Sequence, residues 1–279
     1  MGASLSILAL LSMPGCSDPL KPVELISEPR VLGARVEVEG APERASPLPG
    51  ETATVRWLVA APEPDPALGW ALAACSAAPP GGALPECAEA PFASAAQDDP
   101  VPGEPAITFA VPDPPSASWL AVTGVVCPGG CSASPGTPVS LDFALGTADE
   151  INSNPSLGAE GLLLDGAPWP EGSDDCSLLP QVAPGSKHAL ELVLDDADRD
   201  ALPQATSVDP AYETLQLSHF VTAGELERAF SVLPGDEPGL RAKVSWKAPS
   251  AATLVRFFLV VRDLRGGSDW ALRALCVAP

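Results

Sequence analysis

The chain has 279 residues, a formal net charge of −21 and 46% hydrophobic residues. This length suggests one large or two ordinary domains, and this apolar content is sufficient for buried cores. No Lys or Arg occurs from Trp57 to Ser186. Because nucleic-acid binding needs basic patches against phosphate, the composition excludes nucleic acid as a partner. It also disfavours adhesion to anionic lipid surfaces.

The N-terminus carries an apolar run, Gly2–Gly15, that is 14 residues long. A helix needs roughly 20 apolar residues to span a bilayer, whereas a run of about 7–15 ending in small residues is typical of a cleaved secretory signal. The junction with Cys16 is similar to the lipobox of bacterial lipoproteins, although Pro14 and the lack of Lys or Arg before Leu5 depart from that pattern. We therefore expect a signal peptide over residues 1–15, with a plain secretory signal as the alternative.

Cys16 is then the acylated first residue of the mature chain, residues 16–26 form a lipid-anchored tether, and a lipid membrane is a partner. The next residue is Ser17 rather than Asp. By resemblance to enteric sorting rules, this favours the outer membrane or cell surface, with the periplasmic face as the alternative. The N-terminus also fits the N-myristoylation pattern, but the signal explains the same residues better.

Residues 27–147 are expected to form the first domain. The chain contains 34 Pro and 24 Gly residues. So many residues that interrupt regular structure favour short strands joined by turns over long helices. Gly69–Cys75 is compatible with a strand or an Ala-rich helix, and its short length between two breakers favours a strand. A loop with Cys87 is expected from Ser76 to about Pro105. The other expected strands are Val31–Glu39, whose second half alternates between apolar and charged residues, Thr52–Ala60, Ala106–Val111, Trp119–Cys127 and Val139–Leu145. Their spacing is typical of an immunoglobulin-like β-sandwich.

Residues 148–155 are polar and contain the only two Asn residues, Asn152 and Asn154, so we interpret them as an interdomain linker. Residues 156–279 are expected to form a second sandwich of the same kind. At Thr222–Glu225, a hairpin turn at Gly224 is favoured over a capped helical turn. The expected strands are Gly161–Asp165, His188–Leu194, Thr214–Val221, Arg228–Leu233, Leu240–Trp246, Val255–Arg262 and Asp269–Val277.

The last two of these strands flank Gly266-Gly267, where a hairpin needs positive φ. This hairpin resembles the final two strands of bacterial immunoglobulin-like and PKD-like domains. About the last 70 residues resemble uncharacterised lipoproteins of high-GC Gram-negative bacteria, with landmarks at His219–Leu226, Trp246–Pro249 and Val261–Asp263. The resemblance implies a fold and a compartment. It implies no activity, so no functional residues are transferred.

Besides Cys16 the chain has six cysteines, an even number that suggests three disulfides in an oxidising compartment. If Gly69–Cys75 and Trp119–Cys127 are antiparallel neighbours, Cys75 and Cys127 lie roughly 20 Å apart, too far for a disulfide. The local pairs Cys75–Cys87 and Cys127–Cys131 are then favoured, and Cys176–Cys276 remains. Zinc is disfavoured because the spacing at Cys127 is C-x₃-C and the chain has only two His.

The sequence contains few candidate catalytic residues. His188 and His219 fall in or beside apolar strand runs, where a structural role is the ordinary interpretation, and no nucleophile elbow, P-loop or zinc-protease motif occurs. Carboxylate pairs such as Asp174 and Asp175 are common by chance in an acidic chain. The sequence therefore favours a protein that is not an enzyme. An exported hydrolase with a site in the Ser76–Pro105 loop or in an acidic turn is an alternative.

The acidic turn contains Asp196, Asp198 and Asp200, which have the 1, 3, 5 spacing of a calcium loop. Ala201 and Ser207 occupy the positions where an EF-hand needs Gly and Glu, so it is not an EF-hand. A solvated acidic turn is the ordinary interpretation. No cofactor is expected, and calcium is the alternative.

Together these patterns predict an all-β protein with two immunoglobulin-like β-sandwiches after a lipoprotein signal. We expect a lipid-anchored cell-envelope protein with a structural or binding role toward a protein or glycan. A calcium-dependent surface adhesin and an exported hydrolase are the alternatives.

Overall fold

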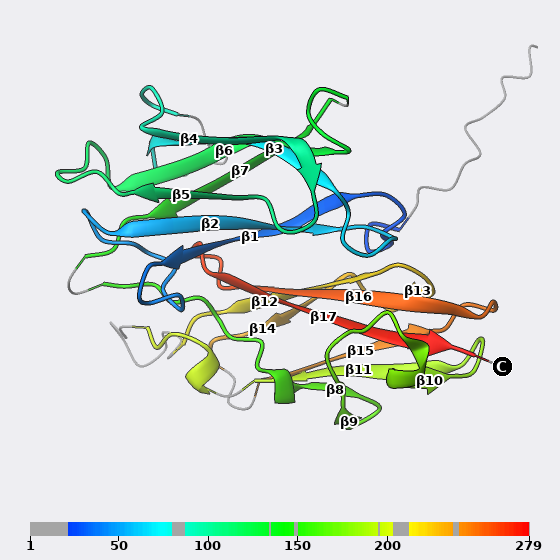
Figure 1. The fold of residues 1–279 in the computed structure, drawn as a ribbon. Helices are drawn as coiled ribbons and strands as arrows, with labels where there is room; N and C mark the ends of the chain where they lie inside the picture. The colour runs from blue at the N-terminus through cyan, green and yellow to red at the C-terminus, as the bar shows by residue number, and fades with distance from the viewer. Residues whose placement is uncertain are drawn as a thin grey trace, which may run out of the picture.

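The structure is a computed structural model that describes residues 22–79, 87–133, 135–147, 150–194, 196–202, 212–236 and 240–278. Within those ranges the regular structure consists of β-strands and three short 3-10 turns, and no α-helix occurs. The strands form two immunoglobulin-like β-sandwiches, stacked so that four sheets lie one above another (Figure 1). The predicted all-β, two-sandwich fold is confirmed.

The first sandwich consists of a three-stranded sheet in the order β1-β2-β5 and a four-stranded sheet in the order β4-β3-β6-β7. Its strands are β1 (Arg30–Val38), β2 (Thr52–Ala60), β3 (Leu68–Ala77), β4 (Ala93–Val101), β5 (Ala106–Ala110), β6 (Trp119–Pro128) and β7 (Thr137–Ala144).

The second sandwich consists of two five-stranded sheets in the orders β13-β15-β11-β8-β9 and β10-β17-β16-β12-β14. Its main strands are β8 (Leu162–Leu164), β11 (Lys187–Val193), β12 (Leu215–Val221), β14 (Phe230–Leu233), β15 (Arg241–Lys247), β16 (Thr253–Arg262) and β17 (Ser268–Val277). Three two-residue strands are added at the edges: β9 (Ala167–Pro168), β10 (Gln181–Val182) and β13 (Glu225–Leu226).

The two sandwiches share one topology. In the first, the first, second and fifth strands form one sheet, and the fourth, third, sixth and seventh form the other. Without the two-residue edge strands, the second sandwich has the same arrangement: β8-β11-β15 faces β14-β12-β16-β17. The chain therefore contains the same unit twice in tandem.

The loop expected from Ser76 to about Pro105 is wrong in part, because it contains β4, which pairs antiparallel with β3. β4 reads Ala-Ser-Ala-Ala-Gln-Asp-Asp-Pro-Val, with one β-branched residue, at its last position, and without aromatic residues, although both kinds usually mark strands. As an edge strand it needs only one neighbour and tolerates Pro and charge. This explains why the pattern predicted a loop.

Strand β16 is buried on both faces. Phe257 and Val261 point into the core of the second sandwich, whereas Phe258 and Val260 pack against Leu32, Leu58 and Ala60 of the first sandwich. A strand that is covered on both faces reads as a continuous apolar run, as Leu254–Val261 does apart from Arg256. The inner sheets of the two sandwiches therefore share an apolar contact.

The segment interpreted as a linker is packed tightly in its described part. Asn154 is 8% exposed, donates to the carbonyl of Val36 at 2.7 Å and accepts from the backbone N–H of Ser268 at 3.0 Å. One side chain thus bonds both sandwiches. Residues 148 and 149 lie outside the described residues.

The end of the expected tether is also docked. Ile26 is fully buried, and its N–H donates to the carbonyl of Val221 at 2.8 Å. Leu25 forms a parallel β-bridge with the same residue. Leu25 and Ile26, which were expected to belong to the tether, are therefore part of the folded domain.

Candidate functional site

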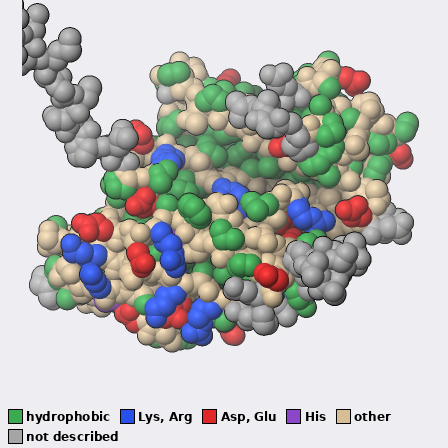
Figure 2. Space-filling model, turned by 180° about the vertical axis from the view of Figure 1, so that it is seen from behind, with side chains coloured by type: hydrophobic (Ala, Val, Ile, Leu, Met, Phe, Trp, Pro, Cys, Tyr) green, Lys and Arg blue, Asp and Glu red, His purple; other side chains and the backbone are tan. Residues whose placement is uncertain are grey.

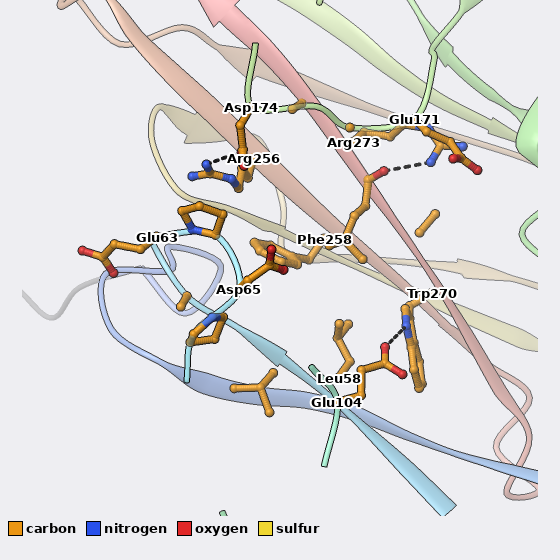
Figure 3. Close-up of a pocket in the computed structure, with 18 of the residues that line it drawn as sticks. Leu58, Glu63, Asp65, Glu104, Glu171, Asp174, Arg256, Phe258, Trp270 and Arg273 are labelled. Carbon is orange, nitrogen blue, oxygen red and sulfur yellow. Dashed lines mark hydrogen bonds and ion pairs between the residues drawn. The ribbon is translucent and has the colours of Figure 1, made fainter. Parts of the chain in front are cut away.

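A cleft opens at one end of the seam between the two sandwiches. Its volume is about 630 Å³, within the range of small-ligand sites. One wall comes from the end of β2, the following loop and Glu104 of the first sandwich; the other comes from β16, β17 and the 171–174 segment of the second. Phe258 and Leu58 lie at its base, where the two sheets are still in contact (Figure 3).

Charged side chains surround this base. Five carboxylates line the cleft: Glu63, Asp65, Glu104, Glu171 and Asp174. Two guanidinium groups line it, those of Arg256 and Arg273. In Figure 3, Asp65 points toward Phe258 from the loop after β2, whereas the carboxylate of Glu63 points away from the other labelled residues.

Both guanidinium groups are engaged by the protein. Arg256 forms an ion pair with Asp174, Nη2–Oδ1 2.6 Å, and donates through Nη1 to the carbonyl of Pro62 at 2.8 Å. Arg273 is 4% exposed and donates to the carbonyls of Trp169 at 3.0 Å and Leu272 at 2.8 Å. Burial lowers the pKa of Arg273. Arg256 links the two walls, because Pro62 and Asp174 belong to different sandwiches.

Trp270 and Glu104 also join the walls. The indole Nε1–H of Trp270 donates to Oε1 of Glu104 at 3.1 Å, across 166 positions of sequence. Burial by the surrounding protein raises the pKa of Glu104, although the indole hydrogen bond opposes that shift. Glu104 nevertheless keeps contact with solvent, since it is an exposed residue, and the hydrogen-bond donor described for its carboxylate is a neutral group.

Three disulfides form with the predicted pairing. Cys75–Cys87 and Cys127–Cys131 are local to the first sandwich, and Cys176–Cys276 spans 100 positions of the second. The register explains the choice, since Cys127 pairs with Gly69 and Cys75 pairs with Ala121 at the other end of the β3–β6 ladder. Cys176–Cys276 attaches the chain after the 171–174 wall to β17. Three disulfides are typical of a protein that folds outside the cytoplasm.

The acidic turn does not form a described metal site. Asp200 accepts from the N–H of Ser153 at 2.8 Å and lies 3.8 Å from Nη1 of Arg265. The side chain of Asp196 lies outside the described residues. Across the described ranges, no group of three His, Cys, Asp or Glu side chains is arranged to hold a metal ion. Asp198 lies within these ranges and belongs to no such group.

His219 is buried on β12, as expected of a structural histidine. It is 3% exposed, and its Nε2 lies 3.2 Å from Oγ of Ser231. Burial, assisted by the nearby charge of Arg228, lowers its pKa to about 4. The ring is therefore neutral at ordinary pH.

His188 belongs to a constellation that the sequence did not reveal. Its Nε2 lies 2.6 Å from Oγ of Ser186, and its Nδ1 lies 2.6 Å from Oδ2 of Asp165. This order resembles a catalytic triad. The Ser186 hydroxyl has a second acceptor within reach, because its Oγ also lies 2.5 Å from the carbonyl oxygen of Ala183. The backbone N–H of Ser186 donates to the same carbonyl, so Ser186 closes this turn. All three residues of the constellation lie outside the cleft lining.

The surface charge is unevenly distributed. On the face shown in Figure 2, Lys and Arg lie over the second sandwich and along the seam, and the outer part of the first sandwich lacks them. Strands β3, β4, β6 and β7 contain no basic residue. Among the described residues of the first sandwich, basic side chains therefore occur only on β1, on β2 and between them.

Cys16 and the predicted signal lie outside the described residues. Among the residues that are described, the structure has no helix with the length and apolarity needed to cross a bilayer.

The fold defines the class as a tandem immunoglobulin-like sandwich protein with an interdomain cleft. No protein-family model matches the chain, and no curated protein matches it. Two solved structures of Escherichia coli alpha-2-macroglobulin are similar to it. The elastase-activated form is 12% identical, with 90% of this chain and 22% of that chain covered, at a TM-score of 0.24. The native form is 14% identical, with 89% and 17% covered, also at 0.24. This chain therefore spans less than a quarter of that protein, and a TM-score this low does not establish a common function.

The sequence patterns did not indicate the cleft. Its polar residues come from elements that are far apart in the chain, and none belongs to a motif. Two signals were indirect: Glu104 lies in the segment proposed to carry a loop-borne site, and Asp174 belongs to a carboxylate pair noted in the sequence.

Proposed function

We propose that the protein is an exported, lipid-anchored envelope protein that binds a ligand in the cleft between its two sandwiches. The observation that carries the proposal is the rigid joint behind the cleft. Asn154 bonds both sandwiches, and Arg256 links the two walls. Walls held at a fixed spacing lose little conformational entropy on binding, which favours affinity.

The compartment is supported by the cysteines. Six pair with one another, which leaves Cys16 for the lipid that its signal-like context suggests. The tether enters the fold beside the cleft, because Ile26 bonds Val221 and the next residue, Thr222, bonds the carbonyl of Arg256 at 3.0 Å. The chain from Cys16 to Pro22 extends at most about 20 Å. A lipid on Cys16 therefore holds this end of the cleft close to the membrane.

Binding is proposed rather than catalysis because of the lining chemistry. The described lining contains neither His nor Cys, and its guanidinium groups are already committed to protein partners. The Ser186 constellation lies outside the cleft.

The test has two parts. The first is the intact mass of the protein from the membrane fraction, under non-reducing conditions, before and after alkylation. A chain that starts at Cys16, carries acyl mass and takes up no reagent is expected. A chain that retains Met1, or one with six free thiols, would overturn the compartment.

The second part places a photo-reactive phenylalanine analogue at Leu272, an exposed residue that lines the cleft, and at Val232, an exposed residue on β14. On intact cells, a cross-link from Leu272 but not from Val232 is expected, and the added change Trp270→Ala should abolish it. Equal labelling from the two positions would contradict the cleft as the binding site.

A further inference from the structure

We propose that the cleft recognises a cationic ligand, specifically a peptide segment of an envelope partner that carries Lys or Arg side chains. This inference rests on the proposed function and adds the ligand class. It is carried by the charge, the partners and the shape of the lining residues.

The lining has a net negative formal charge, and from outside it Arg56 and Arg35 favour the ionised form of Glu104. With five carboxylates and two guanidinium groups, its formal charge is −3. Even without Glu63, which points away in Figure 3, four carboxylates face two cations. The chain as a whole carries −21. A cleft of one sign between low-dielectric walls focuses the field and attracts the opposite charge.

The hydrogen-bonding groups that a ligand could use are negatively charged carboxylates. Asp174 is neutralised by Arg256, and both guanidinium groups are used by protein carbonyls and this carboxylate, so they do not offer an anion-binding pair. Glu104 receives only the neutral indole N–H of Trp270 among its described hydrogen bonds. A bound ammonium or guanidinium would give Glu104 and Asp65 the charge-assisted bonds that the neutral indole does not supply.

The shape fits a long side chain with a terminal charge. Leu272, which is 45% exposed, and the half-buried indole of Trp270 offer apolar surface to a ligand. The indole lies beside Glu104. Lys and Arg place an aliphatic stem on apolar surface and keep the charged end in polar surroundings. Aromatic faces add cation–π attraction. A cleft of about 630 Å³ accepts a few residues of such a peptide.

A neutral glycan is the competing ligand, since carboxylates also accept from sugar hydroxyls. It would partly desolvate several carboxylates without neutralising any of them, and burying an unpaired charge is costly. The charge of the lining therefore favours the cationic peptide.

The experiment uses the mature chain and isothermal titration calorimetry at low and moderate salt. The probes are the acetylated, amidated tripeptide Lys-Ala-Lys, its uncharged analogue Gln-Ala-Gln, and the neutral disaccharide N,N′-diacetylchitobiose. We expect only Lys-Ala-Lys to bind, with an affinity that falls as salt rises.

Two variants identify the site, Glu104→Gln and Asp65→Asn. Asp65 has φ +44°, a conformation that Asn tolerates, so the second variant keeps the loop. Each is expected to weaken binding by about three- to tenfold. The matched control is Glu39→Gln, the same charge change on an exposed residue outside the cleft, and it should bind as the parent does. Melting temperatures establish that the variants fold.

Absence of Lys-Ala-Lys binding, equal binding of the uncharged analogue, preferential binding of the disaccharide, or equal loss in Glu39→Gln would each overturn the cationic ligand. If the cross-link from Leu272 persists in that case, the cleft remains the binding site and only the ligand class is wrong.

Discussion

Asn152 donates a hydrogen bond from Nδ2 to Oδ2 of Asp263 at 2.7 Å, across 111 positions of sequence. Both residues are buried, at 7% and 2% exposure. Asp263 also accepts from the backbone N–H groups of Arg265 and Gly267 in the β16–β17 turn. Burial raises the pKa of Asp263, and these donors oppose the shift. The segment between the sandwiches and the last hairpin are therefore one structural unit.

Replacing Asn152 by Ala should weaken this unit. The variant leaves one oxygen of a buried carboxylate without its donor, which costs about 1–3 kcal/mol. Because the lost bond joins the connecting segment to the second sandwich, we expect the single calorimetric transition to broaden or split into two. Ser153→Ala is the matched control, because Ser153 bonds Asp200 through its backbone N–H, which the substitution keeps. A calorimetric trace of Asn152→Ala identical to that of the parent would show that the bond contributes nothing.

Glu213 should make stability fall as pH rises. It is 2% exposed, and burial raises its pKa to about 7 from 4.5, although the N–H of Asp200 and the charge of Arg265 favour the ionised form. Between about pH 4.5 and 7 the folded state binds more protons than the unfolded state, so the free energy of unfolding decreases through that window.

Glu213→Gln should remove this dependence and raise stability at pH 8 by roughly 3 kcal/mol. Urea unfolding at pH 5 and pH 8 measures the difference, and Glu39→Gln serves as the exposed control. A variant that is less stable than the parent at pH 8 would mean that the Arg265 contact outweighs burial.

His219 acts in the opposite direction. Its pKa is lowered to about 4 from 6.5, so between those values the unfolded state takes up a proton that the folded state does not. Stability is then lost as pH falls from about 6.5 toward 4 and is constant above 6.5. His219→Gln stays neutral and can still reach Ser231. It should lose roughly 2–3 kcal/mol less than the parent between pH 7 and pH 4. Parallel stability profiles of the two proteins would contradict this assignment.

The disulfides should differ in their contribution to stability. Cys176–Cys276 closes a loop of 100 residues and Cys127–Cys131 a loop of four. On the chain-entropy relation, removing the first costs about 4–5 kcal/mol and removing the second about 2 kcal/mol. Paired Cys→Ala variants of each bridge, compared by urea unfolding, provide the measurement. Equal losses would show that native contacts, not loop length, set the contribution of each bridge.

The sequence by itself determined the fold class, most strands and the cysteine pairing. Along β15, exposed and buried residues alternate throughout. Before β17 comes the Gly-Gly turn, in which Gly266 has φ +110°. Both are local signals that need no knowledge of distant residues. The disulfide pairing followed because strand length separates Cys75 from Cys127. The signal peptide and the acyl group on Cys16 stay predictions of the sequence.

Only the tertiary structure decided what lies between the two sandwiches. The polar character of Asn152 and Asn154 suggested a solvated linker, but their amides bond residues more than 100 positions away. β4 was missed because an edge strand is defined by its neighbour more than by its own composition. The cleft brings Glu104 to Trp270 and Pro62 to Arg256. Such contacts depend on how two complete sandwiches pack, and local periodicity carries no information about that packing.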